Sequence, residues 1–151
     1  MALKKGKSNP FWIVLDAHGV LIPSSERTIL SNLSRQTRIP FLLILARWFL
    51  SHIPVQMGKM DSKAFYEKVL GRPLTAHAYR EWITSPYTQK MEIHPSILHE
   101  LKRLKKKGWK LGVLSNMHEH QAEMHRAKKT FKDFDMVLFS CDLGHMKPFP
   151  A

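Results

Sequence analysis

Three polar groups in this sequence lie past short, mostly apolar runs: Asp16 comes after "FWIVL", Ser115 and Asn116 end "WKLGVLSN", and Lys147, in "GHMKPFP", comes after "DMVLFS". A carboxylate can attack phosphorus or carbon and form a covalent intermediate, which divides one difficult step into two. A hydroxyl, backbone N–H groups and an ammonium can hold and neutralise the oxygens of a transferring phosphoryl group. These residue types therefore point to transfer of a group onto Asp16, provided that the fold brings them together.

The elements that would position these groups alternate between strands and helices. Apolar runs predict strands at Phe11–Leu15, at residues 109–114 and at Asp135–Ser140, and the first is typical of a parallel strand covered on both faces. An amphipathic helix from Pro95 to Gly108 and a polar helix from about His118 to Lys129 connect them. Helices that cross over between short strands predict a parallel sheet, and ligands bind outside the carboxyl ends of such strands.

The block between residues 22 and 90 is predicted to be all-helical, because nothing in it alternates convincingly as a strand. We therefore expect an α/β core made of residues 8–21 and 91–151, interrupted by a helical unit of residues 22–90. The expected helices begin after Ser24 or Ser25, at Pro40, after Asp61 and after Thr75; the first three run to about Arg35, His52 and Gly71, and the last spans "AHAYREWIT".

With its motifs in order, the sequence resembles the haloacid dehalogenase (HAD)-like hydrolase superfamily, and within it the phosphatase-like subgroup with a helical cap. "IVLDAHGVL" is similar to the first motif of that family, "LGVLSN" to the second and "LGHMKPFP" to the third. The resemblance covers nearly the whole chain. It implies a Rossmann-like parallel-sheet core with an inserted all-helical cap.

The resemblance also implies roles for single residues. Asp16 would be the nucleophile and a ligand of Mg²⁺, and the backbone carbonyl of His18 would be a second ligand. Ser115 would donate a hydrogen bond to the phosphoryl group with Asn116 beside it. Lys147 would neutralise charge on Asp16 and on the phosphate.

His18 departs from the family pattern, because phosphatases of this family usually carry a second aspartate at that place. The aspartate protonates the leaving alcohol and later activates water. An imidazole that titrates near neutrality could do the same work. It could equally be a spectator, since related families carry an aromatic residue or a glycine there.

The end of the chain is the second departure. The sequence stops at Ala151, before the fourth motif of the family, an apolar strand that ends in aspartates and lies beside the first strand. Mg²⁺ prefers several oxygen ligands that include carboxylates, so we expect an incomplete magnesium site. We also expect a C-terminally truncated, weakly active or inactive form whose first strand has an unpaired edge.

Composition narrows the class of protein. The 44% apolar and 10% aromatic content is that of a globular chain, and the single cysteine, Cys141, excludes an intramolecular disulfide, which fits a cytoplasmic location. Arg47 and His52 interrupt the most apolar segment, so no membrane span is expected. The net charge of +12 fits a small anionic substrate, but the basic–aromatic pattern of a nucleic-acid module is missing.

Other candidate residues receive structural interpretations. His118, His120 and His125, together with Glu119 and Glu123, are expected on a solvated polar helix rather than around a metal. Cys141 is expected to be a small buried side chain.

The function that this pattern favours is Mg²⁺-dependent hydrolysis of a small phosphorylated metabolite through an aspartyl phosphate on Asp16. The cap would close over the substrate, and Arg47, Lys59 and Arg72 could reach an anionic group from it. A haloacid dehalogenase, in which Asp16 attacks carbon without Mg²⁺, is one alternative. A non-catalytic binding protein that keeps the fold is another. The substrate and the oligomeric state stay open.

Overall fold

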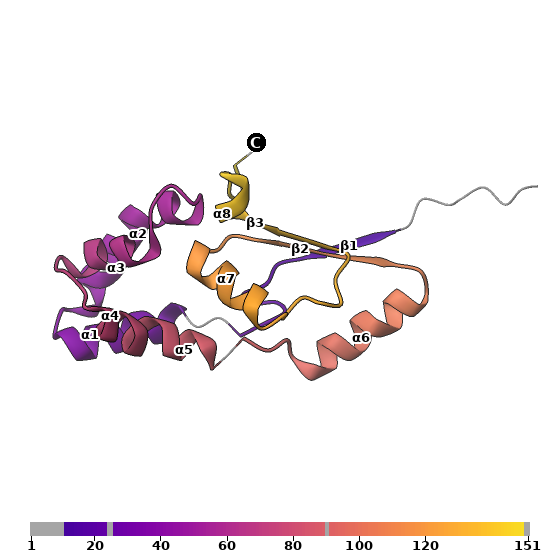
Figure 1. The fold of residues 1–151 in the computed structure, drawn as a ribbon, viewed down its shortest axis with the longest axis horizontal. Coiled ribbons are helices and arrows are strands. Elements are labelled where there is room, and N and C mark those ends of the chain that lie inside the picture. The colour runs from indigo at the N-terminus through magenta and orange to yellow at the C-terminus, as the bar shows by residue number, and fades with distance from the viewer. Residues whose placement is uncertain (1–10, 24–25, 90, 150–151) are drawn as a thin grey trace, which may run out of the picture.

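A parallel sheet forms the centre of the chain in the computed structural model, which describes residues 11–23, 26–89 and 91–149. Its strands are β1 (Trp12–Leu15), β2 (Lys110–Ser115) and β3 (Met136–Phe139), in the order β1-β2-β3 (Figure 1). Both pairings are parallel. The prediction of an α/β fold with a parallel sheet is therefore confirmed.

The two faces of the sheet differ. Ile13 pairs with Leu111 and Leu15 pairs with Val113, so these side chains share one face, where they join the apolar cluster. Helices α6 (Pro95–Lys106) and α7 (Glu119–Ala127) lie on one side of the sheet in Figure 1. Successive strand residues point to opposite faces, and on the other face Trp12 is 45% and Val14 is 48% exposed. The expectation that β1 is covered on both faces is wrong for the described residues.

Helix α6 shows how the sequence fixes one crossover. Pro95 occupies the start of the helix, where its missing N–H group costs nothing. Leu101 is buried against the sheet, and Lys102 and Arg103 are exposed. The basic cluster around residue 105 is thus the solvated side of this helix, as predicted.

The segment between β1 and α6 is helical, and we call residues 26–88 the helical insert. Asp61 caps one helix by accepting a hydrogen bond from the Ala64 amide at 2.9 Å, and Thr75 caps the next through the Ala78 amide at 3.1 Å. The caps predicted at Ser24 or Ser25 lie outside the described residues. The helices are α1 (Glu26–Thr37), α2 (Phe41–Gln56), α3 (Ser62–Leu70), α4 (Ala76–Tyr79), a π-helix (Arg80–Thr84) and α5 (Ser85–Thr88).

Two helical boundaries differ from the prediction. Helix α2 continues past His52 to Gln56 although Pro54 lies inside it. Pro54 lacks the N–H that would bind the Leu50 carbonyl, and Leu50 is 85% exposed, so water can serve that carbonyl. The helix after Thr75 also runs further than expected, since a π-helix leads directly into α5.

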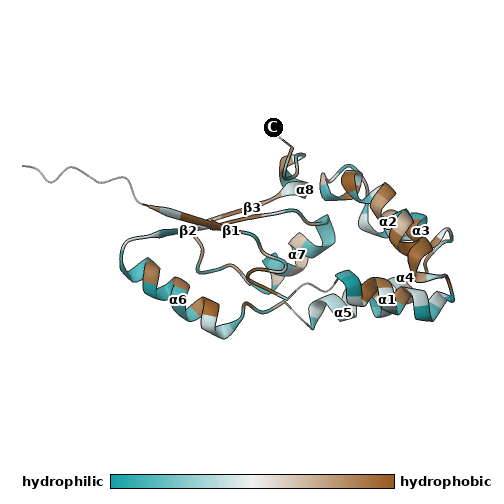
Figure 2. Cartoon of the chain, turned by 180° about the vertical axis from the view of Figure 1, so that it is seen from behind, coloured by the Kyte–Doolittle hydropathy of each residue, from teal (hydrophilic) through white to brown (hydrophobic). Residues whose placement is uncertain are grey.

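The apolar residues form two clusters. One lies within the helical insert and includes Ile44, Phe65 and Ile83, all fully buried. The other lies between the sheet and its helices and includes Leu21 and Val113. Figure 2 shows strongly apolar residues on α2, α3 and the strands. Among the described residues, no helix combines the length and apolarity needed to span a membrane.

Hydrogen bonds of the Ser140 side chain join the insert to the sheet at the short helix α8 (Ser140–Leu143). The Ser140 hydroxyl donates to the Gln56 carbonyl at the end of α2 and accepts from the Met117 amide at 3.0 Å. Gly58 follows α2 with φ at 67°. A Cβ atom at Gly58 would lie 2.3 Å from the Cys141 carbonyl oxygen, so glycine is required by both conformation and space.

We expect Gly58→Ala to destabilise the protein. Left-handed backbone costs a non-glycine residue about 1–2 kcal/mol, and the clash with Cys141 adds roughly 2 kcal/mol more because backbone must shift. Urea unfolding measures the loss. Gly108→Ala is the control, because Gly108 has φ at 90° but nothing within 4 Å of its Cβ position. Equal losses in the two variants would contradict the role of the contact.

Candidate active site

Asp16 and Lys147 form an ion pair at the carboxyl edge of the sheet. Asp16 directly follows β1, and its Oδ1 atom lies 3.3 Å from Lys147 Nζ. The same Oδ1 accepts a hydrogen bond from the Ala17 amide at 2.8 Å. Both side chains are partly exposed, at 41% for Asp16 and 38% for Lys147. The pair can therefore meet a solute, and the structure brings these two predicted residues together.

Lys147 is held in place by the end of β2. Its Nζ donates to the Leu114 carbonyl at 2.8 Å. The Asn116 side chain grips the Lys147 main chain, since Nδ2 donates to the Lys147 carbonyl at 2.8 Å and Oδ1 accepts from the Lys147 amide at 2.9 Å. Asn116 thus positions the lysine. The sequence had indicated only its place beside Ser115.

Ser115 ends β2 and is 1% exposed. Among the described residues, its hydroxyl has no hydrogen-bond partner. A buried hydroxyl without a partner costs free energy, which an acceptor brought by a ligand would recover. The hydroxyl is thus an unsatisfied donor at the end of β2, and among the described residues no contact joins it to Asp16 or Lys147.

The chain turns sharply between Asp16 and the insert. Gly19 adopts φ of 81°, and its amide donates to the Ile22 carbonyl at 2.7 Å. His18 forms a bridge with Ile22. The Ala17 and Ile22 carbonyls accept the hydrogen bonds of this bridge, and the His18 carbonyl takes no part in them.

The ring of His18 faces a second histidine. Its Nε2 lies 3.4 Å from Nε2 of His125, whose Nδ1 lies 3.2 Å from the Thr130 hydroxyl. Burial lowers the pKa of His18, and the nearby Asp16 carboxylate opposes that effect. Burial also lowers the pKa of His125, to about 3. Both rings are therefore neutral near pH 7.

The helix that carries His125 is not the solvated polar helix that the sequence predicts. His118 is 2% and His125 is 1% exposed, and the ring nitrogens of His120 are buried as well. The His118 ring centroid lies 4.9 Å from that of Phe65, and the His120 centroid lies 5.9 Å from that of Tyr79. These histidines pack against aromatic residues of the insert. The prediction failed because a neutral imidazole packs like a small aromatic ring.

The prediction that Cys141 is a buried side chain is also wrong. It is half-exposed rather than buried, and its Sγ lies 3.9 Å from Asp142 Oδ1. Burial, helped by the Asp142 charge, raises the pKa of the thiol to about 11. The group is protonated near neutrality and unsuited to nucleophilic attack.

The described residues offer part of a magnesium site. The Asp16 carboxylate and the His18 carbonyl are oxygen donors of the kind that Mg²⁺ prefers, and this ion commonly keeps water and substrate phosphate oxygens as further ligands. No three His, Cys, Asp or Glu side chains in the described part of the chain converge to hold a metal. The donor set fits Mg²⁺ as far as it extends.

The cations expected to reach the substrate do not line the site. Arg47 is turned toward the Val69 carbonyl at 3.5 Å and packs against Gly71, and Lys59 and Arg72 are exposed. A cavity of about 670 Å³ instead lies between α1, α2 and Asn116, and the arginine that lines it is Arg27. The missed signal is the spacing of Phe41, Leu45, Trp48 and His52, which places them on one face of a helix.

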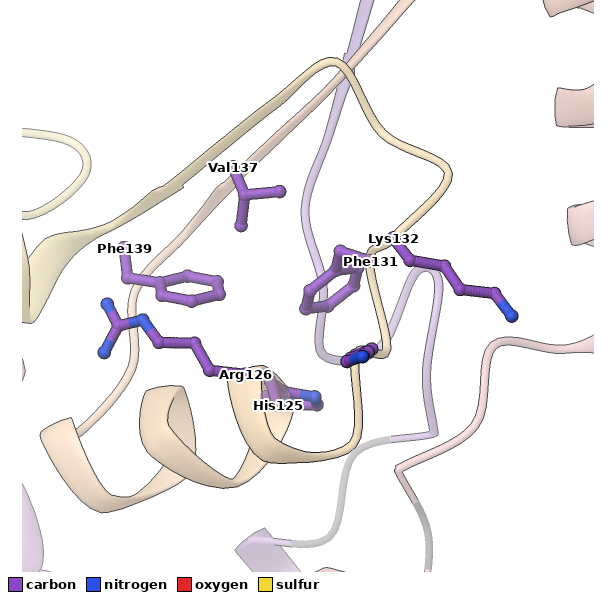
Figure 3. A pocket seen from close by; sticks show the side chains of 7 residues that line it. His125, Arg126, Phe131, Lys132, Val137 and Phe139 are labelled. Atoms are coloured by element: carbon purple, nitrogen blue, oxygen red, sulfur yellow. The ribbon is translucent and has the colours of Figure 1, made fainter.

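A second cavity, of about 280 Å³, lies beside α7 and β3. Figure 3 shows the rings of Phe131 and Phe139 at this cavity, with Val137 near them and Arg126 and His125 on the helix side. The Arg126 guanidinium is paired with Asp142 and lies 5.5 Å from the centroid of the Phe139 ring. Its charge is thus compensated, and neither Asp16 nor Lys147 lines this cavity.

Fold and site together define an α/β protein with a carboxylate and a lysine at the carboxyl edge of a parallel sheet. Residues 12–151 match the family of haloacid dehalogenase-like hydrolases. The chain belongs to that family, and the resemblance inferred from its motifs is confirmed. No curated protein matches the sequence significantly.

Solved structures share the fold at low sequence identity. A predicted HAD-like family hydrolase from Porphyromonas gingivalis is 20% identical with a TM-score of 0.67, covering 93% of this chain and 71% of that one. A HAD family enzyme from Bacteroides thetaiotaomicron, in complex with magnesium and inorganic phosphate, is 18% identical with a TM-score of 0.69, covering 93% and 73%. The L-2-haloacid dehalogenase from Xanthobacter autotrophicus is 17% identical with a TM-score of 0.58, covering 94% and 61%.

Proposed function

We propose that the chain hydrolyses phosphate monoesters through an aspartyl phosphate on Asp16. The observation that carries the proposal is the ion pair of 3.3 Å between Asp16 and a lysine anchored to the end of β2. Such a pair places a cation beside the nucleophile, where phosphoryl charge would gather. The similar enzyme from Bacteroides, solved with magnesium and inorganic phosphate, supports this choice.

The two carboxylate oxygens of Asp16 have different roles in the proposed reaction. Oδ1 is occupied by the Ala17 amide and by Lys147. Oδ2 has no hydrogen bond among the described residues and is the oxygen that attacks phosphorus. The Oδ2–P bond forms as the bond from phosphorus to the ester oxygen breaks, and the leaving alkoxide takes a proton from a water molecule. Water then attacks phosphorus and releases phosphate and the free carboxylate.

The other site residues hold the phosphoryl group during both steps. Lys147 neutralises its charge, and the unpaired Ser115 hydroxyl donates a hydrogen bond to one of its oxygens. Mg²⁺ held by the Asp16 carboxylate and the His18 carbonyl would add positive charge against the phosphoryl oxygens. The helical insert would act as a cap, because α1 and α2 line the cavity beside Asn116.

Carbon–halogen hydrolysis is the second candidate. Its support is the neutral, half-buried His18 in the place of a second carboxylate, since attack of Asp16 on carbon needs neither that carboxylate nor Mg²⁺. The Xanthobacter dehalogenase has also been solved with chloropropionic acid covalently bound. Lys147 beside Asp16 would serve either reaction.

Product assays separate the candidates. The full chain is incubated with a panel of phosphate monoesters and, separately, with chloropropionic acid, each with Mg²⁺ and with EDTA. Phosphate release that EDTA abolishes supports the proposal. Halide release that resists EDTA supports the dehalogenase. A folded chain that releases neither ion would overturn both and leave a non-catalytic member of the family.

We further expect the His18 ring to be dispensable for turnover. Its Nε2 faces His125 and its lowered pKa leaves it a poor proton donor near pH 7. His18→Ala is therefore expected to change kcat by less than about 3-fold, and His18→Asp, which supplies a carboxylic acid, to raise it about 10-fold or more. Phosphate release measured from pH 5 to 8 checks both. A loss above about 100-fold in His18→Ala would show that the ring is the acid and base after all.

A further inference from the structure

The cavity between α1, α2 and the sheet adjoins the proposed phosphoryl site. Its volume of about 670 Å³ lies within the range of roughly 300–1,000 Å³ typical of small-molecule sites. Asn116 and Met146 line it on the side of the sheet. Asn116 holds the main chain of Lys147, so a molecule in this cavity touches the support of the catalytic lysine.

The wall opposite the sheet is apolar and flat. Phe41, Leu45, Trp48 and Phe49 line the cavity from one side of α2. The Trp48 ring lies parallel to the His52 ring at 4.9 Å between centroids, which makes an aromatic platform. Aromatic rings and apolar groups gain most from such a surface, because ring faces stack and little water has to be displaced from polar atoms.

Polar side chains also line this cavity. Glu26, Arg27, His52 and Gln56 are those of the insert. Burial raises the pKa of Glu26, and the His52 charge opposes the effect. The sugar part of a sugar phosphate would need partners for several hydroxyls, and the side of the cavity formed by Phe41, Leu45 and Trp48 offers none, so hydroxyls turned toward it would be left unpaired.

We propose that this cavity takes the organic part of the substrate, and that the substrate is a phosphate monoester of an aromatic or similarly flat, apolar alcohol. The inference rests on the proposed function, because it assumes that the phosphate group of the substrate binds at Asp16 and Lys147. It changes the expected substrate from a small, polar metabolite to a larger ester that is anionic at one end only.

Calorimetric titration of the full chain tests the proposal without requiring turnover. The probes are 1-naphthyl phosphate, 1-naphthol, glycerol 3-phosphate and inorganic phosphate. Naphthyl phosphate is expected to bind at least about 10-fold more tightly than inorganic phosphate, as stacking of an aromatic ring in a preformed apolar site allows. Glycerol 3-phosphate is expected to bind no more tightly than inorganic phosphate.

A pair of neighbouring variants locates the binding. Phe49 lines the cavity and is 58% exposed, so Phe49→Ala removes part of the wall without emptying the core. It is expected to weaken naphthyl phosphate about 5-fold and to leave inorganic phosphate unchanged. Leu50 is the matched control, because it lies next in the chain, is 85% exposed and does not line the cavity. Leu50→Ala is expected to change neither affinity.

The probes separate this inference from the proposed function. If 1-naphthol binds and Phe49→Ala weakens it while inorganic phosphate does not bind, the apolar site stands and the phosphatase proposal fails. If inorganic phosphate binds and esters are hydrolysed but naphthyl phosphate binds no better than glycerol 3-phosphate, the apolar site is overturned and the phosphatase stands. Equal weakening by Phe49→Ala and Leu50→Ala would also overturn the assignment.

Discussion

Asp16→Asn is expected to lower kcat for phosphate ester hydrolysis by roughly 10³-fold or more, because an amide cannot serve as the nucleophile. Asparagine keeps the size of the side chain and can still accept the hydrogen bond from the Ala17 amide. What it loses is the negative charge that pairs with Lys147 at 3.3 Å. Phosphate release under saturating ester, with Mg²⁺ present, measures the change.

The fold should survive this substitution. Asp16 and Lys147 are both more than a third exposed, so the ion pair contributes at most about 1 kcal/mol to stability. Asp142→Asn is the matched control, since Asp142 is an exposed carboxylate paired with Arg126 and lies on α8. The control is expected to keep its activity. If Asp16→Asn keeps more than about a tenth of the wild-type rate, Asp16 is not the nucleophile.

The sequence predicted the part of the site that depends on strand ends. Asp16 follows one short apolar run and Ser115 follows another, and parallel strands bring their carboxyl ends to one edge. The pairing of Lys147 with Asp16 was expected from the resemblance to the family. The two hydrogen bonds between the Asn116 side chain and the Lys147 main chain could not be predicted, because they depend on how the chain after β3 folds back over the end of β2.

The contents of the insert were harder to predict than its helices. The helix starts after Asp61 and Thr75 could be predicted because a capping side chain bonds an amide only three residues away, and both caps are confirmed. Which cations face the site depends on how the helices turn against each other, and Arg47 turned toward Val69 instead. One face of β1 is also more open than its apolar run indicated, with Val14 at 48% exposure.

The prediction that "MHEHQAEMH" forms a solvated polar helix was wrong for a different reason. A histidine counts as polar in any pattern, but its neutral ring costs little to bury among aromatic residues. His118 shows this most clearly, because neither of its ring nitrogens has a hydrogen-bond partner among the described residues. Its neighbours are the rings of Phe65 and Tyr66, at centroid distances of 4.9 Å and 6.0 Å.

This burial is expected to make the protein sensitive to mild acid. Burial, with neighbouring histidines, lowers the pKa of His118 to about 3, and burial lowers that of His120 to about 4 although Asp61 opposes it. The ordinary histidine pKa is about 6.5. Above that value both states are neutral and these residues give no pH dependence. Below it the unfolded chain takes up protons that the folded chain refuses, so the free energy of unfolding falls as pH falls from about 6.5 toward 4.

The size of the effect follows from the same linkage. Each histidine can lower the free energy of unfolding by up to about 1.4 kcal/mol per pH unit in that window. His118→Phe keeps an aromatic ring beside Phe65 and removes one titrating group without breaking a hydrogen bond. We expect urea unfolding to show that the free energy of unfolding of this variant falls less between pH 7 and pH 5 than that of the wild type. If the two proteins are equally stable at pH 7, the variant is expected to be more stable by about 2 kcal/mol at pH 5. His99→Phe, at an exposed position on α6, is expected to leave the slope unchanged. An unchanged slope in His118→Phe would show that His118 is protonated within the folded protein, which would require its ring to reach water or an acceptor that the packing against Phe65 and Tyr66 excludes.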